Sequence, residues 1–222
     1  MEAYLIIIAV ALQPILSYFG YQYLAHREEG TCQWKQFFRP KLDLWALVLS
    51  AVSCLVSILA FCYSGLLQDD TFMRALLNAL TLNFLAIVGY IDLREKVIPN
   101  EWIGFGLILW LVMALLDIFV AQTSWLGVLK FSLFGGGLVG GVLLLLALIL
   151  KSSLGMGDVK LFFVLGLLYG VSDAYAILLF SIIIMALISL VLLAIKKVTV
   201  KTAIPMAPFV VLGFILCILA GM

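Results

Sequence analysis

The chain has 222 residues, of which 66% are hydrophobic and 11% are charged, and its formal net charge is +1 at pH 7. Soluble globular domains are about half apolar. A chain of this composition cannot hide its apolar side chains from water in a single core, so a soluble protein is excluded and lipid must be its solvent. No nucleic-acid partner is expected.

Eight apolar stretches follow one another along the chain, and a helix needs about 20 such residues to span a bilayer. They are Ala3–Ala25, Leu44–Leu67, Arg74–Ile91, Trp102–Ala121, Trp125–Leu150, Val159–Gly170, Ala174–Ile195 and Ile204–Gly221, of which the sixth is short. Backbone groups in hydrocarbon must be hydrogen-bonded internally. The sequence therefore predicts an all-α, polytopic integral membrane protein, a single membrane domain over residues 1–222 with no soluble domain.

The first stretch resembles a secretory signal in position, but no positive charge precedes it and it is long for the apolar part of a signal. We expect it to be retained as a span.

The basic residues divide the connections between the stretches into two kinds. All of the 13 lysines and arginines except Arg74 and Lys130 lie in or beside the connections after the first, third, fifth and seventh stretches. Basic connections of multi-pass proteins stay in the cytoplasm. The chain is therefore expected in the plasma membrane with these four connections cytoplasmic and both termini outside.

The sequence has four cysteines and one histidine. Cys54, Cys62 and Cys217 lie within apolar stretches, where cysteine behaves as a small apolar residue. Cys32 lies in a cytoplasmic connection, and His26 offers one nitrogen ligand only. We expect no disulfide, no metal site and no cofactor.

Glycines gather in the fifth stretch, where two pairs, Gly136/Gly140 and Gly137/Gly141, each have the spacing of a small-xxx-small motif. Such pairs let a second membrane helix approach closely. We interpret the cluster as a packing surface.

Two cytoplasmic connections each hold an aspartate where apolar sequence meets a polar turn. Asp92 is followed by Pro99 and Asn100, which start the next helix, and Asp158 is preceded by Gly155 and Gly157. Non-helical backbone at membrane depth is tolerated where protein covers it or where it lines a cavity. Both aspartates are therefore candidates for a site on the cytoplasmic side.

Two facing carboxyl groups can hold one proton between them, as in aspartic proteases. The ionised carboxylate then takes a proton from water while the protonated group donates to the scissile carbonyl. The simpler interpretation is that Asp158 caps the helix that begins at Val159 and that Asp92 is an interfacial charge balanced by Arg94 or Lys96. Position alone leaves both interpretations open.

Three segments resemble the type IV prepilin peptidases, which are intramembrane aspartyl proteases with a G-x-G-D signature. Gly155–Leu161 reads GMGDVKL, residues 91–100 read IDLREKVIPN, and residues 204–209 read IPMAPF. The three matches stand in the family's order. The resemblance extends from Asp92 to the C-terminus, and with the span that precedes it the peptidase-like region is expected over residues 74–222.

The resemblance implies that Asp92 and Asp158 are the catalytic pair and that Gly155, Gly157, Lys160, Pro99 and Asn100 support the site. The implied substrate is a type IV pilin precursor, whose basic leader is cut at the cytoplasmic membrane face during pilus assembly or secretion. Lys160 is expected to favour the ionised form of Asp158, to hold a substrate carboxylate, or to extend into solvent. Oligomeric state is left open.

Large members of that family carry paired C-x-x-C motifs after the first span and also N-methylate the mature pilin. The corresponding connection here is short and holds only Cys32, so we expect a peptidase without methyltransferase activity. Two alternatives stay open: a presenilin- or signal-peptide-peptidase-like protease, and a transporter that binds a proton or ion at the same aspartates.

Overall fold

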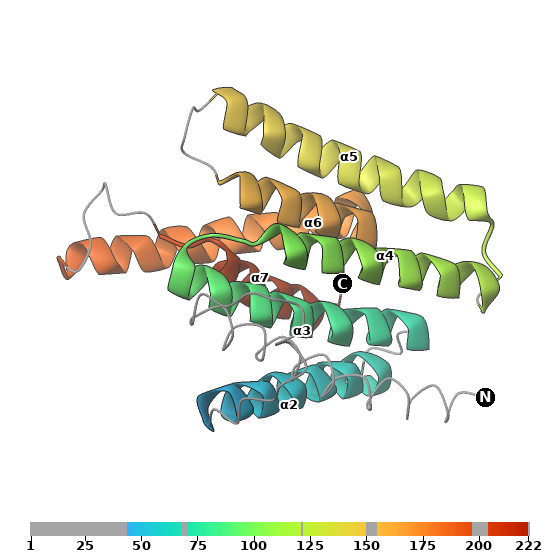
Figure 1. Cartoon of the computed structure of the whole chain (residues 1–222), viewed down its shortest axis with the longest axis horizontal. Coiled ribbons are helices and arrows are strands. Elements are labelled where there is room, and N and C mark those ends of the chain that lie inside the picture. The colour runs from blue at the N-terminus through green and yellow to red at the C-terminus, as the bar shows by residue number, and fades with distance from the viewer. Residues whose placement is uncertain (1–43, 68–70, 121, 150–154, 197–203, 222) are drawn as a thin grey trace, which may run out of the picture. The chain divides into compact units, whose positions relative to one another are not determined.

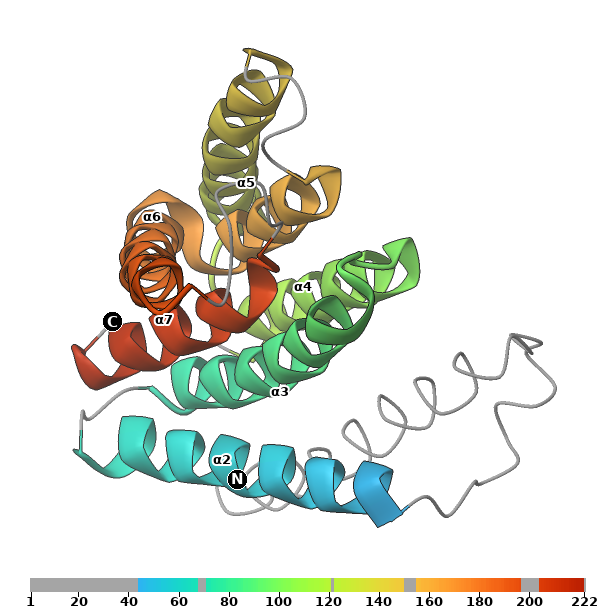
Figure 2. The same cartoon turned by 90° about the vertical axis from the view of Figure 1, so that its left-hand side faces the viewer.

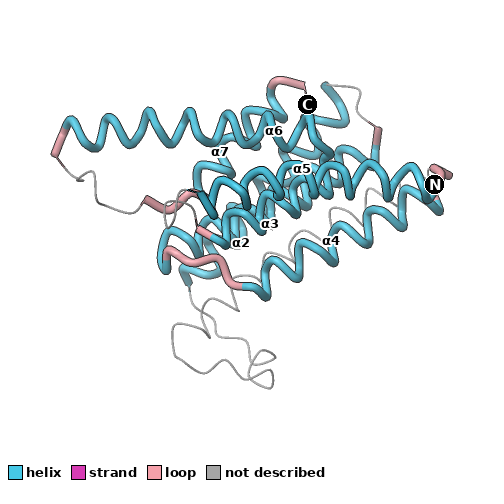
Figure 3. The backbone as a smooth tube through the Cα atoms, turned by 90° about the horizontal axis from the view of Figure 1, so that it is seen from above, coloured by secondary structure: helices cyan, strands magenta, loops and turns pink. Residues whose placement is uncertain are grey.

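The computed structural model describes residues 44–67, 71–120, 122–149, 155–196 and 204–221. Every regular element in these ranges is a helix, as the uniform colour of the coils in Figure 3 shows. The all-α prediction is thereby confirmed. The helices are α2 (Leu44–Leu67), α3 (Phe72–Glu95), α4 (Asn100–Phe119), α5 (Trp125–Ile149), α6 (Met156–Ala194) and α7 (Ala207–Leu219).

The count of about eight spans is not confirmed. Four described helices, α3 to α6, are long and apolar enough to cross a membrane. Helix α7 has 13 residues, fewer than the roughly 20 that a spanning helix needs. The predicted first span, Ala3–Ala25, lies outside the described residues. Large apolar side chains remain exposed on α4, α5 and the second half of α6, as expected of surfaces that face lipid.

Several helix boundaries differ from the sequence prediction by a few residues, and two of the differences concern the aspartates. Helix α3 continues past Ile91 to Glu95, and α6 begins at Met156 rather than Val159. Helix α3 continues because no glycine or proline lies between Ile91 and Glu95, and it ends at Lys96, whose φ of 55° is left-handed. Asp92 and Asp158 therefore lie inside helical turns and not in the loops between helices.

The described residues divide into two compact units, one that ends at Ile87 and one from Val88 to Ala220, and the boundary falls inside α3. In the first unit, Phe61 of α2 and Phe72 of α3 meet edge to face with ring centroids 5.8 Å apart. Ser57, which is fully buried, donates to the carbonyl oxygen of Ser53 at 2.8 Å. A buried hydroxyl in an apolar helix is thus satisfied by its own backbone.

In the second unit, α5 lies against the first half of α6, as Figures 1 and 2 show. A Cβ atom on Gly136 would lie 2.8 Å from Leu167, and one on Gly140 would lie 2.9 Å from Phe163. The close approach predicted for Gly136/Gly140 is confirmed. Among the described residues, none lies within 4 Å of a Cβ atom on Gly137 or Gly141, so no close approach is seen at that pair.

Helix α6 is bent at Gly170, whose φ of 73° and ψ of −169° form a conformation open essentially to glycine alone. A Cβ atom there would also collide with the ring of Phe131 on α5. Beyond the bend the second arm of α6 runs back toward the side from which the first arm came (Figure 1). The sixth and seventh predicted spans correspond to these two arms.

Helix α7 packs against both arms of α6. A Cβ atom on Gly213 would lie 2.5 Å from the hydroxyl oxygen of Ser181 in the second arm. The ring of Phe214 meets that of Tyr169, in the first arm, at a centroid distance of 5.4 Å and an interplanar angle of 68°. Both rings are buried, so α7 is fixed on α6 by a close helix contact and an aromatic pair.

Candidate active site

Asp92 lies in the last turn of α3 and is 5% exposed. The backbone N–H of Ala207, the first residue of α7, donates to Asp92 Oδ2 at 2.9 Å. The first N–H groups of a helix have no partner within the helix and carry partial positive charge. The carboxylate of one helix is therefore held at the N-terminus of another.

Asp158 lies in the first turn of α6 and is held by its own helix. Its backbone N–H donates to the carbonyl oxygen of Gly155 at 3.0 Å, and its carboxylate accepts a hydrogen bond from the backbone of Gly155. A third-position acid that reaches back to the residue before the helix is half of a capping box. The capping interpretation from sequence is thus correct in kind, but the helix begins at Met156 and the side chain acts as its third residue.

The first turn of α6, which holds Asp158, contacts the segment that follows Asp92. A Cβ atom on Gly157 would lie 3.0 Å from Cβ of Ile98, next to Pro99. Only a glycine at 157 lets the first turn of α6 come so close to the segment between α3 and α4. The charge of Asp92 also acts on Asp158. The two carboxyl groups are therefore close enough for their charges to repel.

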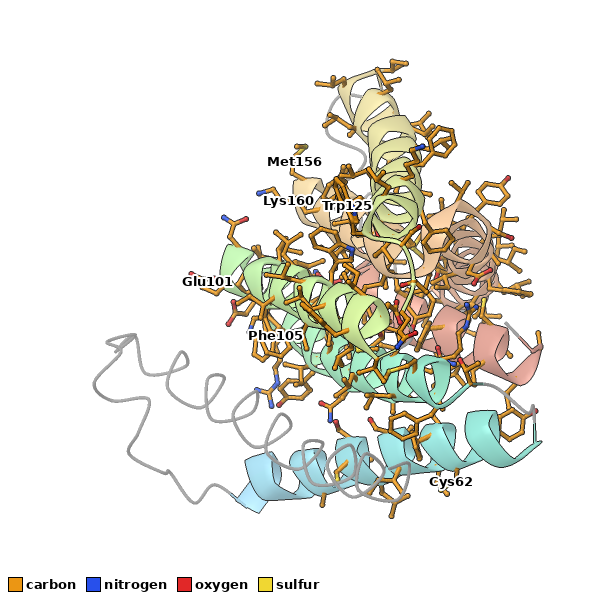
Figure 4. All side chains as sticks on the ribbon, turned by 90° about the vertical axis from the view of Figure 1, so that its right-hand side faces the viewer. Cys62, Glu101, Phe105, Trp125, Met156 and Lys160 are labelled. Carbon is orange, nitrogen blue, oxygen red and sulfur yellow. The ribbon has the colours of Figure 1, made fainter. Side chains whose placement is uncertain are left out.

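Lys160 joins the starts of α4 and α6. Its ammonium donates to the side-chain oxygen of Asn100 at 2.7 Å, in an exposed position. Pro99 precedes α4 with φ −65° and ψ 143°, and its carbonyl oxygen accepts from the N–H groups of Trp102 and Ile103. Lys160, Met156 and Glu101, at the starts of these two helices, lie on the same side of the view in Figure 4.

The supporting residues predicted from sequence are thus brought together: Gly155 and Gly157 contact Asp158 and Ile98, and Lys160 contacts Asn100. Their roles in a reaction stay predictions. Ala207 and Gly89, which lies one turn before Asp92, were not among the site residues predicted from the sequence. The IPMAPF segment was the available signal for Ala207, because it was the third matching motif and had been given no role.

Within the part of the chain that the structure describes, no three histidine, cysteine, aspartate or glutamate side chains gather as a metal site would require. The chemistry available at the site is that of two interacting carboxyl groups. Such a pair can hold one proton between them, so that one group acts as a base while the other acts as an acid.

Comparison with protein families gives one match: the model of the type IV leader peptidase family fits residues 79–190, half of the chain. The matched residues include both aspartates and end before α7. Comparisons with curated proteins and with solved structures found no match.

Proposed function

The chain belongs to the type IV leader peptidase family, and we propose that it is an aspartic endopeptidase that cleaves the leader from type IV pilin-like precursors, with Asp92 and Asp158 as its catalytic residues. The observation that carries the proposal is the contact between the first turn of α6, which holds Asp158, and Ile98, in the segment that follows Asp92, within the region that the family model matches. The family match also favours this function over a presenilin-like protease and over a transporter.

In the proposed reaction one carboxylate removes a proton from a water molecule, and the water oxygen attacks the scissile carbonyl carbon. The other, protonated carboxyl group donates its proton to the carbonyl oxygen, giving a neutral tetrahedral diol. The diol then collapses: the carbon–nitrogen bond breaks, the departing amine takes the proton that the first aspartate had accepted, and the second aspartate recovers its own. No metal or nucleophilic side chain is required.

We assign the site to the cytoplasmic face of the plasma membrane and both termini to the outside, on the distribution of basic residues. A leader with basic residues would stay in the cytoplasm while the apolar helix of the precursor lies in the bilayer. The connection after the first predicted span has no paired cysteine motifs, so cleavage without N-methylation is proposed. The mature product should then lack the mass of an added methyl group.

The proposal is tested by co-expressing the chain with an epitope-tagged type IV prepilin and following the loss of the leader as a shift on an immunoblot. Asp92→Asn and Asp158→Asn should each reach the membrane fraction at normal abundance and leave the leader uncut. Asp117→Asn, in the last turn of α4, is the matched control and should cut normally. Cleavage at the wild-type rate by either of the first two variants would remove that aspartate from the mechanism.

The same variants separate cleavage from transport. If the wild-type chain never cuts the leader but carries a proton flux into vesicles that Asp92→Asn and Asp158→Asn abolish, the aspartates serve transport and the peptidase proposal fails.

A further inference from the structure

Helix α7 reaches Asp92 from the far end of the sequence. The donor, Ala207 N–H, and the acceptor, Asp92 Oδ2, are 2.9 Å apart and belong to residues separated by 115 positions. Ala207 is fully buried. Pro208, which has no N–H of its own, occupies the next position, and the backbone of Met206, one residue before Ala207, also donates to the Asp92 carboxylate.

The hydrogen bond depends on a close contact between α3 and α7. A Cβ atom on Gly89, three residues before Asp92, would lie 3.1 Å from Cγ2 of Val211 and 3.4 Å from Cα of Pro208. Residues three apart lie on the same face of a helix. Glycine at position 89 therefore lets the first turn of α7 rest on the face of α3 that carries Asp92.

The other side of α7 rests on α6, the helix that carries Asp158. Gly213 meets Ser181 and Phe214 meets Tyr169. These contacts leave α7 little freedom to slide, because a glycine contact and a buried aromatic pair both demand one register. Helix α7 thus connects Asp92 to the helix of its partner.

We propose that the backbone N–H of Ala207 is a positioning group that holds the Asp92 carboxylate in the orientation needed for catalysis, and that α7 transmits the position of α6 to Asp92. The inference rests on the proposed function. It gives the IPMAPF segment a physical role: its backbone begins α7 at the place where the N-terminus of that helix meets the aspartate.

The direct test replaces Ala207 by (S)-lactic acid through nonsense suppression, which changes the N–H to an ester oxygen and leaves the methyl group in place. Lactic acid at position 220 is the matched control. The N–H of Ala220 donates to the carbonyl oxygen of Leu216 at 2.9 Å, at the end of α7 that is far from Asp92. With a purified prepilin in vesicles, the Ala207 ester should lower kcat about tenfold or more at an unchanged KM, and the Ala220 ester should keep the wild-type kcat.

A wild-type kcat in the Ala207 ester, or a change in KM alone, would overturn the inference. Asp92→Asn in the same assay separates the two proposals. If Asp92→Asn still cuts at the wild-type rate, the proposed function fails. If Asp92→Asn is inactive while the Ala207 ester is fully active, the aspartate is catalytic and only its positioning by α7 is wrong.

A second series tests the same idea with ordinary substitutions, should the ester fail to fold. Gly89→Ala places a methyl group against Val211 and should lower kcat by pushing α7 away from Asp92. Val211→Ala removes the opposing methyl groups and alone should leave kcat near the wild-type value. The double variant should recover most of the activity that Gly89→Ala loses. Full activity of Gly89→Ala, or a double variant no better than Gly89→Ala, contradicts the inference.

Discussion

The two candidate catalytic aspartates are held in different ways. Asp92 depends on a backbone N–H from a helix 115 residues away, whereas Asp158 depends on Gly155, three residues before it in the same turn. A locally held side chain keeps its orientation whenever its own helix forms. A side chain held across the fold is correctly placed only after the helices have packed. The site therefore combines one aspartate that is held within its own helix with one that is held by the packing of two helices.

The largest expected effect concerns the surface that supports the first arm of α6, which carries Asp158. Gly135→Ala would press a methyl group onto the backbone of Gly166 and to 2.6 Å from Cα of Gly170. Overpacking of this kind costs about 1–3 kcal/mol of folding free energy. The loss should be seen when the detergent-solubilised protein is unfolded by heat or by denaturant.

Gly137→Ala, on the same helix, is the control, because its methyl group would meet none of the described residues within 4 Å. It should be neutral or slightly stabilising, since alanine favours helix over glycine. Equal losses in the two variants would mean that α5 does not support α6 through its glycines.

The next effect tests the contact between the two aspartate-bearing segments. Gly157→Ala would place its Cβ atom 3.0 Å from Cβ of Ile98, and neither atom can rotate away. The segments should separate by a few tenths of an ångström or more, and kcat for leader cleavage should fall by up to about a hundredfold with little loss of folded protein. Gly141→Ala, whose methyl group would meet none of the described residues within 4 Å, should cut normally, and comparable rates for the two variants would argue against the contact between Gly157 and Ile98.

A smaller effect is expected where Asp158 is held locally. Gly155→Ala would bring a methyl group to 2.9 Å from Asp158 Oδ2. The carboxylate is the mobile end of a side chain and can turn aside, so the expected cost is that of one weakened hydrogen bond, about 0.5–1.5 kcal/mol. Single-turnover cleavage should slow several-fold, and an unchanged rate would show that Asp158 needs no support from Gly155.

Much of this arrangement could be predicted from the sequence. The features that could not be predicted depend on how helices pack against each other. Helix length, composition and the two aspartates follow from local pattern. The choice between Gly136/Gly140 and Gly137/Gly141 does not, because the pairs point about 100° apart on one helix and only the position of α6 decides between them. The contact of Ala207 with Asp92 joins residues 115 positions apart, and no local pattern reports it.

The smallest effect belongs to Lys160. Its exposed hydrogen bond to Asn100, 2.7 Å long, should contribute at the low end of the usual range, so that Lys160→Ala slows cleavage about twofold to threefold. Lys160→Arg should keep a donor and most of the rate. In a double-mutant cycle, Lys160→Ala should cost nothing more once Asn100 is alanine. A persistent loss in that background would instead mean that Lys160 acts on Asp158 or on the substrate.

The central claim is that Asp92 and Asp158 act as one catalytic unit, and the most direct measurement compares three purified variants cutting the same prepilin in vesicles: Asp92→Asn, Asp158→Asn and the double variant. If the two carboxyl groups act together in one reaction, each single variant should lose at least about a hundredfold in kcat. The double variant should then be no slower than the slower of the two single variants. Losses that add in the double variant, or a single variant that cuts at the wild-type rate, would contradict the account.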